Sequence, residues 1–158
     1  MKKFWASIAI IILVAAINLA SVSAESARWV KHENPDKFPI EVLQLVNKER
    51  AKVGAAPLKF AKDLAASAYV RAKELPIKFS HTRPDGSKCF TAMPQIGHVI
   101  GENLAGGQTS PKQVVQAWMD SKTHRDNILS KKFKEIGIVY YYQPNSKYKH
   151  YWVQHFRG

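Results

Sequence analysis

The sequence predicts an α+β fold, with helices packed on a mainly antiparallel sheet. Helical periodicity of apolar residues occupies residues 39–75 and returns at 110–129. Alternation typical of strands is confined to residues 135–156. Helices and strands are thus segregated along the chain, an order that favours α+β over a parallel α/β sheet. A length of 158 residues fits one domain with a sizeable core.

The amino terminus has the layout of a secretory signal peptide. Lys2 and Lys3 precede an apolar run over residues 4–20, and Val22-Ser23-Ala24 resembles a cleavage site. An uncleaved membrane anchor is the alternative, although a span needs about 20 apolar residues and this run is slightly shorter. We expect no transmembrane segment after cleavage, and therefore a secreted or envelope-associated protein. The predicted organisation is a signal peptide at 1–24, a lead-in at 25–38 and a domain at 39–158.

Two helices are predicted in the first half of the domain. The first begins at Pro39 and stops at Gly54, positions that suit a proline in the first turn and a glycine at the end. The second runs from about Ala61 to Leu75, and its alanine-rich apolar face allows close approach to another layer. The following stretch, which includes the glycine-rich residues 101–107, is predicted to be irregular.

The second half contains a helix, a short helical piece and a hairpin. Ser110-Pro111-Lys112-Gln113 forms a capping box with proline at the first helical position, and this helix should stop near Ser121. A short helical piece follows from about Thr123 to Leu129. Residues 135–143 and 148–156 then alternate as two strands joined by a turn.

The chain is strongly basic and has one cysteine. Its formal charge of +12 favours anionic cell-wall polymers, lipid headgroups or glycans, although solubility alone would also explain it. Cys89 excludes an intrachain disulfide, and a buried, inert thiol is favoured over a nucleophile. The aromatic residues of the C-terminal hairpin suggest stacking on nucleic acid or glycan, but cross-strand pairs on a half-buried sheet explain them better. We therefore rank nucleic-acid binding last.

His81, Glu102 and His124 are the candidate chemistry of this sequence. Two imidazoles and a carboxylate suit a zinc ion, which takes three protein ligands and an open position, and also suit acid–base catalysis. The alternative is that each residue is satisfied separately. Motifs of named hydrolases, such as H-E-x-x-H and G-x-S-x-G, are missing. His150 and His155 fall on opposite faces of the last strand, so both cannot point into one site.

Several motifs occur in an order that resembles the CAP superfamily of cysteine-rich secretory, antigen 5 and pathogenesis-related proteins, in its bacterial SCP-like branch. The resemblance covers about residues 40–156. Its motifs are Phe79-Ser80-His81-Thr82-Arg83-Pro84-Asp85-Gly86, Gly101-Glu102-Asn103-Leu104-Ala105, Trp118-Met119-Asp120-Ser121, His124-Arg125-Asp126-Asn127-Ile128-Leu129, Phe133, Glu135-Ile136-Gly137-Ile138 and Tyr151-Trp152-Val153-Gln154.

The resemblance implies an α-β-α sandwich, a secreted or surface location and a cavity that holds a divalent cation in some members. His81, Glu102 and His124 match the cavity residues. Supporting positions would be Asn103, Ser121, Arg125, Asn127, Tyr151 and Gln154. Two departures are that animal and plant members resemble Trp-x-x-Glu where this chain has Ser121, and carry histidine where it has Tyr151.

Two functions follow from this reading. The first is a binding module that takes a lipid, glycan or peptide at the cell envelope, with zinc as the cation that the site would accept. The second is a metal-assisted or acid–base hydrolase that uses His81, Glu102 and His124. A non-enzymatic binding role is favoured over the enzyme.

Overall fold

The computed structural model describes residues 35–94 and 99–158. The predicted signal peptide, most of the lead-in, His32 and His98 lie outside these residues. The described chain begins with a 3-10 turn, η1 (Pro35–Lys37), and a second one, η2 (Cys89–Ala92), precedes the middle strand. The helices are α2 (Phe38–Lys52), α3 (Lys62–Glu74), α4 (Pro111–Asp120) and α5 (Lys122–Leu129). The strands are β1 (Lys59–Phe60), β2 (Ile100–Gly106), β3 (Glu135–Tyr142) and β4 (His150–Arg157).

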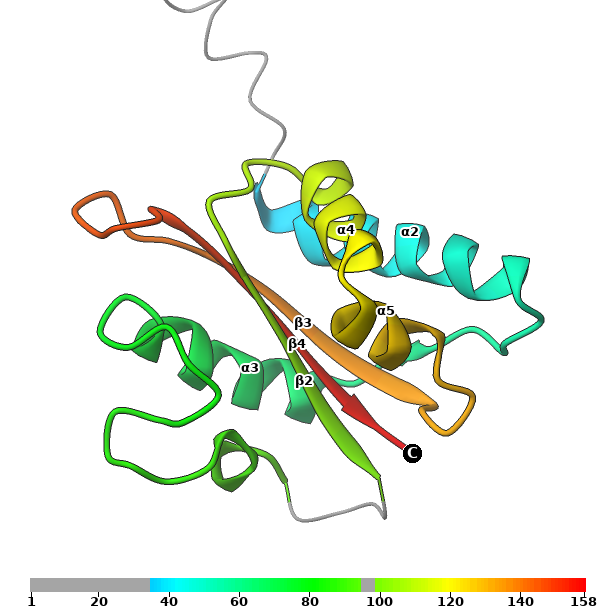
Figure 1. Ribbon diagram of the computed structural model, residues 1–158, viewed down its shortest axis with the longest axis horizontal. Helices are drawn as coiled ribbons and strands as arrows, with labels where there is room; N and C mark the ends of the chain where they lie inside the picture. Colours follow the sequence, from blue (N-terminus) through cyan, green and yellow to red (C-terminus); the bar gives the residue numbers. More distant parts are fainter. Residues whose placement is uncertain (1–34, 95–98) are drawn as a thin grey trace, which may run out of the picture. The chain divides into compact units, whose positions relative to one another are not determined.

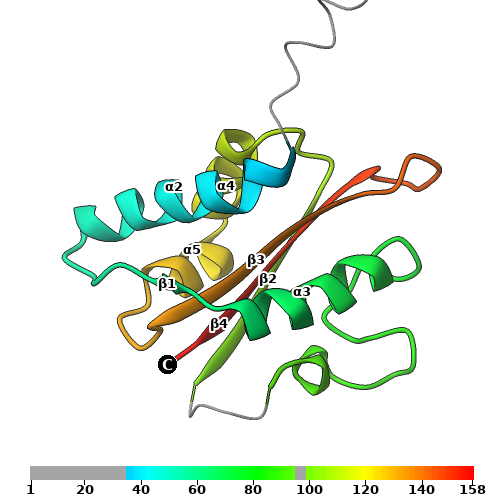
Figure 2. The ribbon, with the colours of Figure 1, turned by 180° about the vertical axis from the view of Figure 1, so that it is seen from behind.

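The strands form one sheet in the order β1-β3-β4-β2. The antiparallel pair β3–β4 is the predicted hairpin, and β4 also pairs with β2 in an antiparallel sense. The short β1 pairs with β3 in parallel. The sheet is therefore mixed rather than purely antiparallel. Figures 1 and 2 show α3 on one face of the sheet and α2, α4 and α5 on the other. This arrangement confirms the three-layer α-β-α sandwich.

The helix α3 lies unusually close to the sheet. A Cβ at Gly137 of β3 would stand 2.2 Å from the backbone nitrogen of Ala65, so only glycine fits this contact. Ala68 and Ala72 continue the same face and are fully buried against the sheet. Small residues on both sides allow the helix and strand backbones to approach, as the alanine-rich pattern predicted.

The opposite face carries the larger apolar core. Side chains of α2 and α4, among them Val42, Val46 and Trp118, pack against Ile136, Ile138 and Trp152 of the sheet. The predicted cap of α4 is present, because the Ser110 hydroxyl accepts from the backbone N–H of Gln113 at 3.4 Å. Within the described residues, every helix is too short or too polar to cross a bilayer.

The glycine-rich stretch is the main departure from the sequence prediction. Residues expected to be irregular form β2, an edge strand that pairs with β4 along its whole length. Its glycines serve close packing: a Cβ at Gly101 would approach the Phe133 ring to 2.8 Å, and one at Gly106 would meet Tyr148 and Phe79 at about 3 Å. Glycine inside a strand weakens the local sequence signal for a strand. This segment is therefore a strand because it pairs with β4, and its own sequence does not predict one.

Candidate functional site

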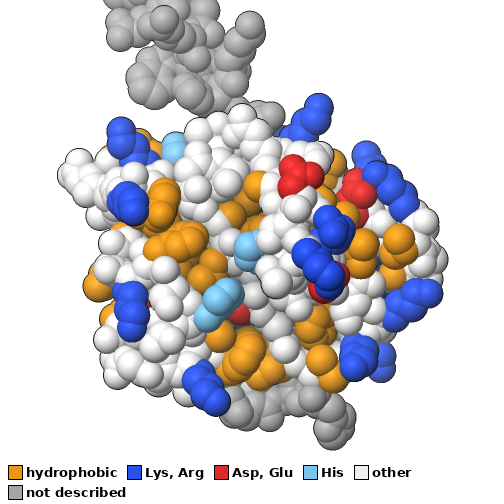
Figure 3. Space-filling model, viewed as in Figure 1, with side chains coloured by type: hydrophobic (Ala, Val, Ile, Leu, Met, Phe, Trp, Pro, Cys, Tyr) orange, Lys and Arg blue, Asp and Glu red, His pale blue; other side chains and the backbone are white. Residues whose placement is uncertain are grey.

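The site lies at the exposed edge of the sheet, where β2 meets the loop that follows α3. A cavity of about 430 Å³ opens there. Figure 3 shows histidine side chains beside an acidic side chain near the middle of this face, with apolar side chains around them. The cavity is lined by His81, Thr82, Lys88, Cys89, Phe90, Ile100, Gly101, Glu102 and Asn127.

Glu102 is the centre of this site. Its side chain extends from β2 toward α3, is 1% exposed, and receives hydrogen bonds on both oxygens. His81 Nδ1 lies 2.8 Å from Oε1, and His155 Nε2 lies 3.0 Å from Oε2. Arg71 Nε donates to Oε2 at 2.9 Å. Sequence reasoning placed His81 and Glu102 in one site, and the structure brings these two side chains into direct contact.

The ionisation of Glu102 is fixed by these partners. Burial alone would raise its pKa, but hydrogen bonds from His155, His81 and Arg71, together with the charge of Arg71, hold the pKa well below its usual range. The carboxyl is therefore an anion that is already neutralised by its neighbours. A group in this state binds cations or hydrogen-bond donors, but it is a poor proton acceptor near neutral pH.

Arg71 couples Glu102 to the loop that carries His81. Its fully buried guanidinium also donates to Glu74 and to the backbone carbonyl of Ser80. Burial lowers the pKa of Arg71, but its bonds to Glu102 and Glu74 raise it further, so the charge is permanent. Arg83 completes the anchor, since its Nη2 donates to Glu74 at 2.6 Å. The loop is thus held to α3 on both sides of His81, by the hydrogen bond of Arg71 to Ser80 and by the ion pair of Arg83 with Glu74.

His155 is a site residue that sequence reasoning did not select. It is fully buried on β4, directly opposite Glu102 in the strand pairing, and its Nδ1 lies 2.7 Å from the Ser67 hydroxyl. His150 points to the other face, where Nδ1 contacts the Tyr140 hydroxyl at 2.8 Å. The prediction that these two histidines cannot share a site is confirmed. The odd spacing of the two histidines predicts that they lie on opposite faces of the strand, but only the β2–β4 register shows which of them faces Glu102.

Cys89 joins the same group. Its thiol, one ligand atom of His81 and one carboxylate oxygen of Glu102 all lie within 4.8 Å of one another. Burial, followed by the charge and hydrogen bonding of Glu102, raises the pKa of Cys89 to about 12. The thiol is therefore protonated in the metal-free protein. Its burial was predicted, but its position beside Glu102 was not.

His124 lies on α5, across β2 from Glu102. Burial first, and then the electrostatic interaction with His81, lower the pKa of His124. Within the described residues, His124 is outside the group of ligand atoms formed by His81, Cys89 and Glu102. Its backbone carbonyl accepts from Asn103 Nδ2 at 3.1 Å, so this turn of α5 is held against β2.

The supporting residues fall into two sets. Asn127 lines the cavity, and its Nδ2 donates to Asn103 Oδ1 at 2.8 Å. Asn103 in turn donates to Gln154 Oε1 at 3.1 Å, and both side chains are fully buried on the α5 side of the sheet. Three residues make contacts elsewhere: Ser121 with Thr123, Arg125 with the carbonyl of Met119, and Tyr151 with Ser146.

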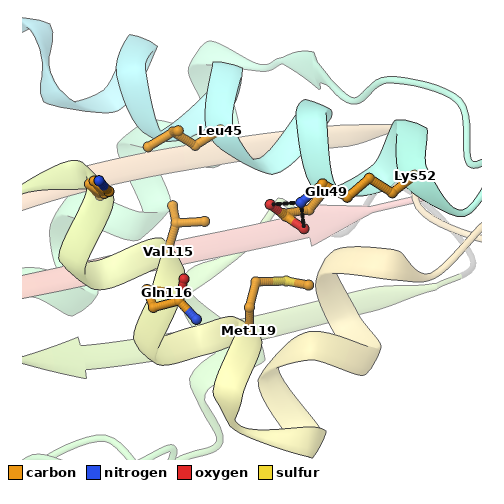
Figure 4. A pocket seen from close by; sticks show the side chains of 7 residues that line it. Leu45, Glu49, Lys52, Val115, Gln116 and Met119 are labelled. Atoms are coloured by element: carbon orange, nitrogen blue, oxygen red, sulfur yellow. Dashed lines mark hydrogen bonds and ion pairs between the residues drawn. The ribbon is translucent and has the colours of Figure 1, made fainter.

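A second hollow of about 310 Å³ lies between α2 and α4. Figure 4 shows Leu45, Val115 and Met119 pointing into it, with the ion pair of Glu49 and Lys52 at one side. Lys112 and Gln116 complete its lining. This groove contains apolar side chains and two exposed lysines, Lys52 and Lys112, but no group like the Glu102 cluster among the residues that line it.

Comparison with known proteins identifies the family. The model of the cysteine-rich secretory protein family, CAP, matches residues 43–156. This chain belongs to the CAP family. YkwD of Bacillus subtilis, an uncharacterised protein, is 37% identical over 123 residues, which is 75% of this chain and 46% of that protein. The chain therefore spans about half the length of this curated relative.

Solved structures show the same fold. An outer surface protein of Borrelia burgdorferi matches with a TM-score of 0.68 at 19% identity, covering 78% of this chain and 94% of that one. An extracellular SCP-domain protein of Bacillus anthracis matches with a TM-score of 0.65 at 22% identity, covering 80% of this chain and 44% of that one. These structures show the sandwich fold, whereas the family rests on the CAP model and on YkwD.

Proposed function

We propose that this CAP protein is exported and binds a small envelope-associated ligand, a lipid, glycan or peptide, in the cavity beside β2. The observation that carries the proposal is the buried Glu102 anion with exposed His81 on its oxygen, at the wall of a cavity of about 430 Å³. Such a cavity, with a few convergent polar groups and perturbed ionisation, is typical of a ligand site. The outer surface and extracellular relatives support an exported location for this chain.

A divalent cation is part of this proposal. His81 and Glu102 are first-choice ligands for zinc in type and already lie in contact. His124, the third ligand expected from sequence, lies near enough to His81 for the two imidazoles to interact electrostatically. The positive charge of Arg71 opposes a cation at Glu102, so the fit depends on a further donor.

Binding is favoured over hydrolysis because of the state of Glu102. A general base works best with a pKa near the operating pH, whereas that of Glu102 is held well below its usual range. The hydrolase alternative would leave proton transfer to His81 or His124. If peptide or ester substrates are turned over by the purified protein, and Glu102→Gln abolishes turnover with the fold retained, the binding proposal is wrong.

Two charge-matched variants test where the ligand binds. Lys88 lines the cavity and Lys112 lines the groove between α2 and α4, and both are exposed. We expect Lys88→Glu to weaken binding of anionic peptidoglycan fragments by about fivefold, equivalent to about 1 kcal/mol, measured by calorimetry. Lys112→Glu should change it little. The reverse result would move the ligand to the groove, and equal effects would indicate general surface adhesion.

Adhesion to anionic phospholipid vesicles provides a second measurement. The basic surface should contribute a component that weakens steeply with salt, because exposed charges are screened over about 10 Å at 0.1 M ionic strength. Flotation of the protein with vesicles at low and high salt measures this component. Salt-insensitive adhesion would contradict a role for the basic surface.

A further inference from the structure

The loop over residues 81–89 is closed by its own backbone. The N–H of Cys89 donates to the carbonyl of His81 at 2.9 Å, and Thr82 and Lys88 form an isolated antiparallel bridge. Gly86 turns the chain with a φ of +87°, a value that favours glycine. His81 and Cys89 are therefore paired ends of a small hairpin, and their side chains are held side by side.

This hairpin is fastened to the domain at the site itself. Arg71 donates to the carbonyl of Ser80, and Arg83 donates to both Glu74, at 2.6 Å, and the Thr91 hydroxyl, at 3.0 Å. The two arginines thus fix the loop on both sides of His81. Two side chains that are already positioned before they bind another group lose little conformational entropy on binding.

A third group that could bind a metal ion, the Glu102 carboxylate, comes from the sheet. Ligand atoms of His81, Cys89 and Glu102 lie within 4.8 Å of one another, with Cys89 and Glu102 buried and His81 exposed. A tetrahedral zinc ion holds its ligands at about 2.0 to 2.3 Å, so small side-chain movements are enough to close the set, and the exposed imidazole is free to make the largest of them. We infer that His81 Nδ1, Cys89 Sγ and Glu102 Oε1 form a site for one thiophilic divalent cation such as Zn²⁺, Co²⁺ or Cd²⁺.

Charge explains why the thiol is needed. Arg71 already neutralises the Glu102 anion at 2.9 Å, so a neutral imidazole and this carboxylate attract a divalent cation only weakly. A thiolate supplies the missing negative charge, and the proton of Cys89 leaves when the metal binds. Hard cations such as Ca²⁺ and Mg²⁺ prefer oxygen ligands and do not draw out a thiolate. The site therefore selects metals that bind sulfur.

The fourth coordination position faces the cavity. Phe90, Ile100 and Asn127 form its walls, so an anionic group of a bound molecule or a water molecule completes the tetrahedron there. This inference rests on the proposed function for the cavity and its cation, and it replaces His124 by Cys89 as the third protein ligand. It also assigns a chemical role to the single cysteine of the chain.

Cobalt titration of the purified, reduced protein tests the site. We expect one Co²⁺ per chain, with visible bands of tetrahedral cobalt and a near-ultraviolet thiolate-to-cobalt charge-transfer band. Cys89→Ser should remove the charge-transfer band and weaken Co²⁺ binding by at least about tenfold, the lower end of what even outer-sphere partners cost. Ca²⁺ and Mg²⁺ should not displace the cobalt, whereas Zn²⁺ should.

Two further variants keep the test decisive. His81 is exposed, so His81→Ala should retain the fold, weaken Co²⁺ binding and alter the visible bands even if Cys89→Ser misfolds. His150 lies on the other face of the sheet, and His150→Ala should leave the cobalt spectrum unchanged. A charge-transfer band that survives in Cys89→Ser overturns the inference.

Other outcomes separate this inference from the proposed function. Cobalt bound without a thiolate band and lost in His124→Ala overturns the role of Cys89 but retains the proposed cation site. No cobalt binding overturns both metal assignments, while the comparison of Lys88→Glu with Lys112→Glu still decides ligand binding in the cavity. Loss of that ligand binding with the thiolate band intact overturns the proposed function alone.

Discussion

Arg50 and Arg71 are the fully buried arginines of the described residues, and they satisfy their charge in different ways. Arg71, on the α3 side of the sheet, donates to two carboxylates. Arg50, on the α2 side, is surrounded by neutral dipoles, and within the described residues its hydrogen bonds go to the backbone carbonyls of Ala56, Ile128, Ser130 and Phe133.

The difference shows that a buried arginine has a structural role on one face of the sheet and sets the charge of a candidate site on the other. The carbonyls around Arg50 come from the end of α5 and the loops that flank β1 and β3, so the guanidinium ties these segments together; burial lowers its pKa. Arg71 instead fixes an anion, Glu102, beside a cavity and creates an electrostatic site. Replacing the two arginines should therefore cause losses of stability that differ in size and in pH dependence.

Replacement of Arg50 should have the largest effect. Arg50→Met removes the guanidinium from four carbonyls, of which that of Ser130 still accepts from the backbone N–H of Phe133. Each of the other three that stays unsatisfied costs about 1 to 3 kcal/mol, which gives a loss of roughly 3 to 9 kcal/mol. Because no carboxyl is involved, the loss should be similar at pH 5 and pH 8. Urea unfolding measures it, with the exposed Lys52→Met of the same helix as control. A loss below about 1 kcal/mol would show that solvent satisfies these carbonyls.

Arg71→Met should cost about 3 kcal/mol near neutral pH, because it removes the permanent positive charge beside the buried Glu102 anion and leaves only the hydrogen bonds of His81 and His155. In the wild type the folded pKa of Glu102 is depressed, so its pairing stabilises the fold above the unfolded pKa and is lost as pH falls through the folded value. The cost of the variant should therefore shrink on acidification, unlike that of Arg50→Met. Because the unfolded pKa of a glutamate is about 4.3, urea unfolding from pH 8 down to about pH 2 measures this slope.

A second replacement sharpens the result for Arg71. Glu102→Gln in the Arg71→Met background removes the buried negative charge that Arg71 no longer neutralises and should recover part of the lost stability. The interaction energy of the double-mutant cycle should be favourable for the wild-type pair and of order 1 kcal/mol or more. Additive losses would mean that the two side chains act independently despite their contact.

Glu74→Gln should have a smaller effect, of about 1 kcal/mol at pH 7, because Glu74 is partly exposed. Burial raises the pKa of Glu74, but the hydrogen bonds of Arg83 and Arg71 lower it further, so its contribution is present above the unfolded pKa and fades as pH falls. The variant should lose less stability than the wild type between about pH 5 and pH 3. Parallel acid profiles of the two proteins would contradict this.

The surface pair of Lys122 and Asp126 should matter least. The two groups are 2.7 Å apart on α5, but their side chains are 79% and 57% exposed. Exposed pairs at this spacing contribute about 0.5 kcal/mol or less, and salt screens them. Thermal unfolding of Lys122→Ala at low and high salt checks the expectation. A larger loss would indicate that Lys122 holds the turn that carries His124.

Local chemistry along the chain was sufficient for several elements. Pro39 and Gly54 were predicted to mark the start and the end of a helix, and α2 begins and ends within two residues of them. Ser110 caps α4 as expected. The alternation over β3 gives the correct faces, with Ile136 and Ile138 on the α2 side and Val139 on the α3 side. These predictions succeeded because each depends on neighbours within one or two turns of the chain.

The edge strand and the site needed long-range contacts. The glycines of β2 look like turn residues in isolation, and only pairing with β4 and packing on Phe133 make them a strand. Glu102 was identified from sequence, but its partners Arg71 and His155 were not, because they arrive from α3 and β4 through the β2–β4 register and the packing of α3 on Gly137.

The sequence alone therefore determined the helices, the hairpin, the α+β class and the identity of His81 and Glu102 as neighbours in a family pattern. Tertiary structure alone decided the edge strand, the partners that keep Glu102 ionised and the place of Cys89 beside it. The physical reason is the distance along the chain over which each kind of interaction acts. Periodicity and capping report which way a side chain points, whereas electrostatic state depends on charges from distant segments that only packing brings within a few ångströms.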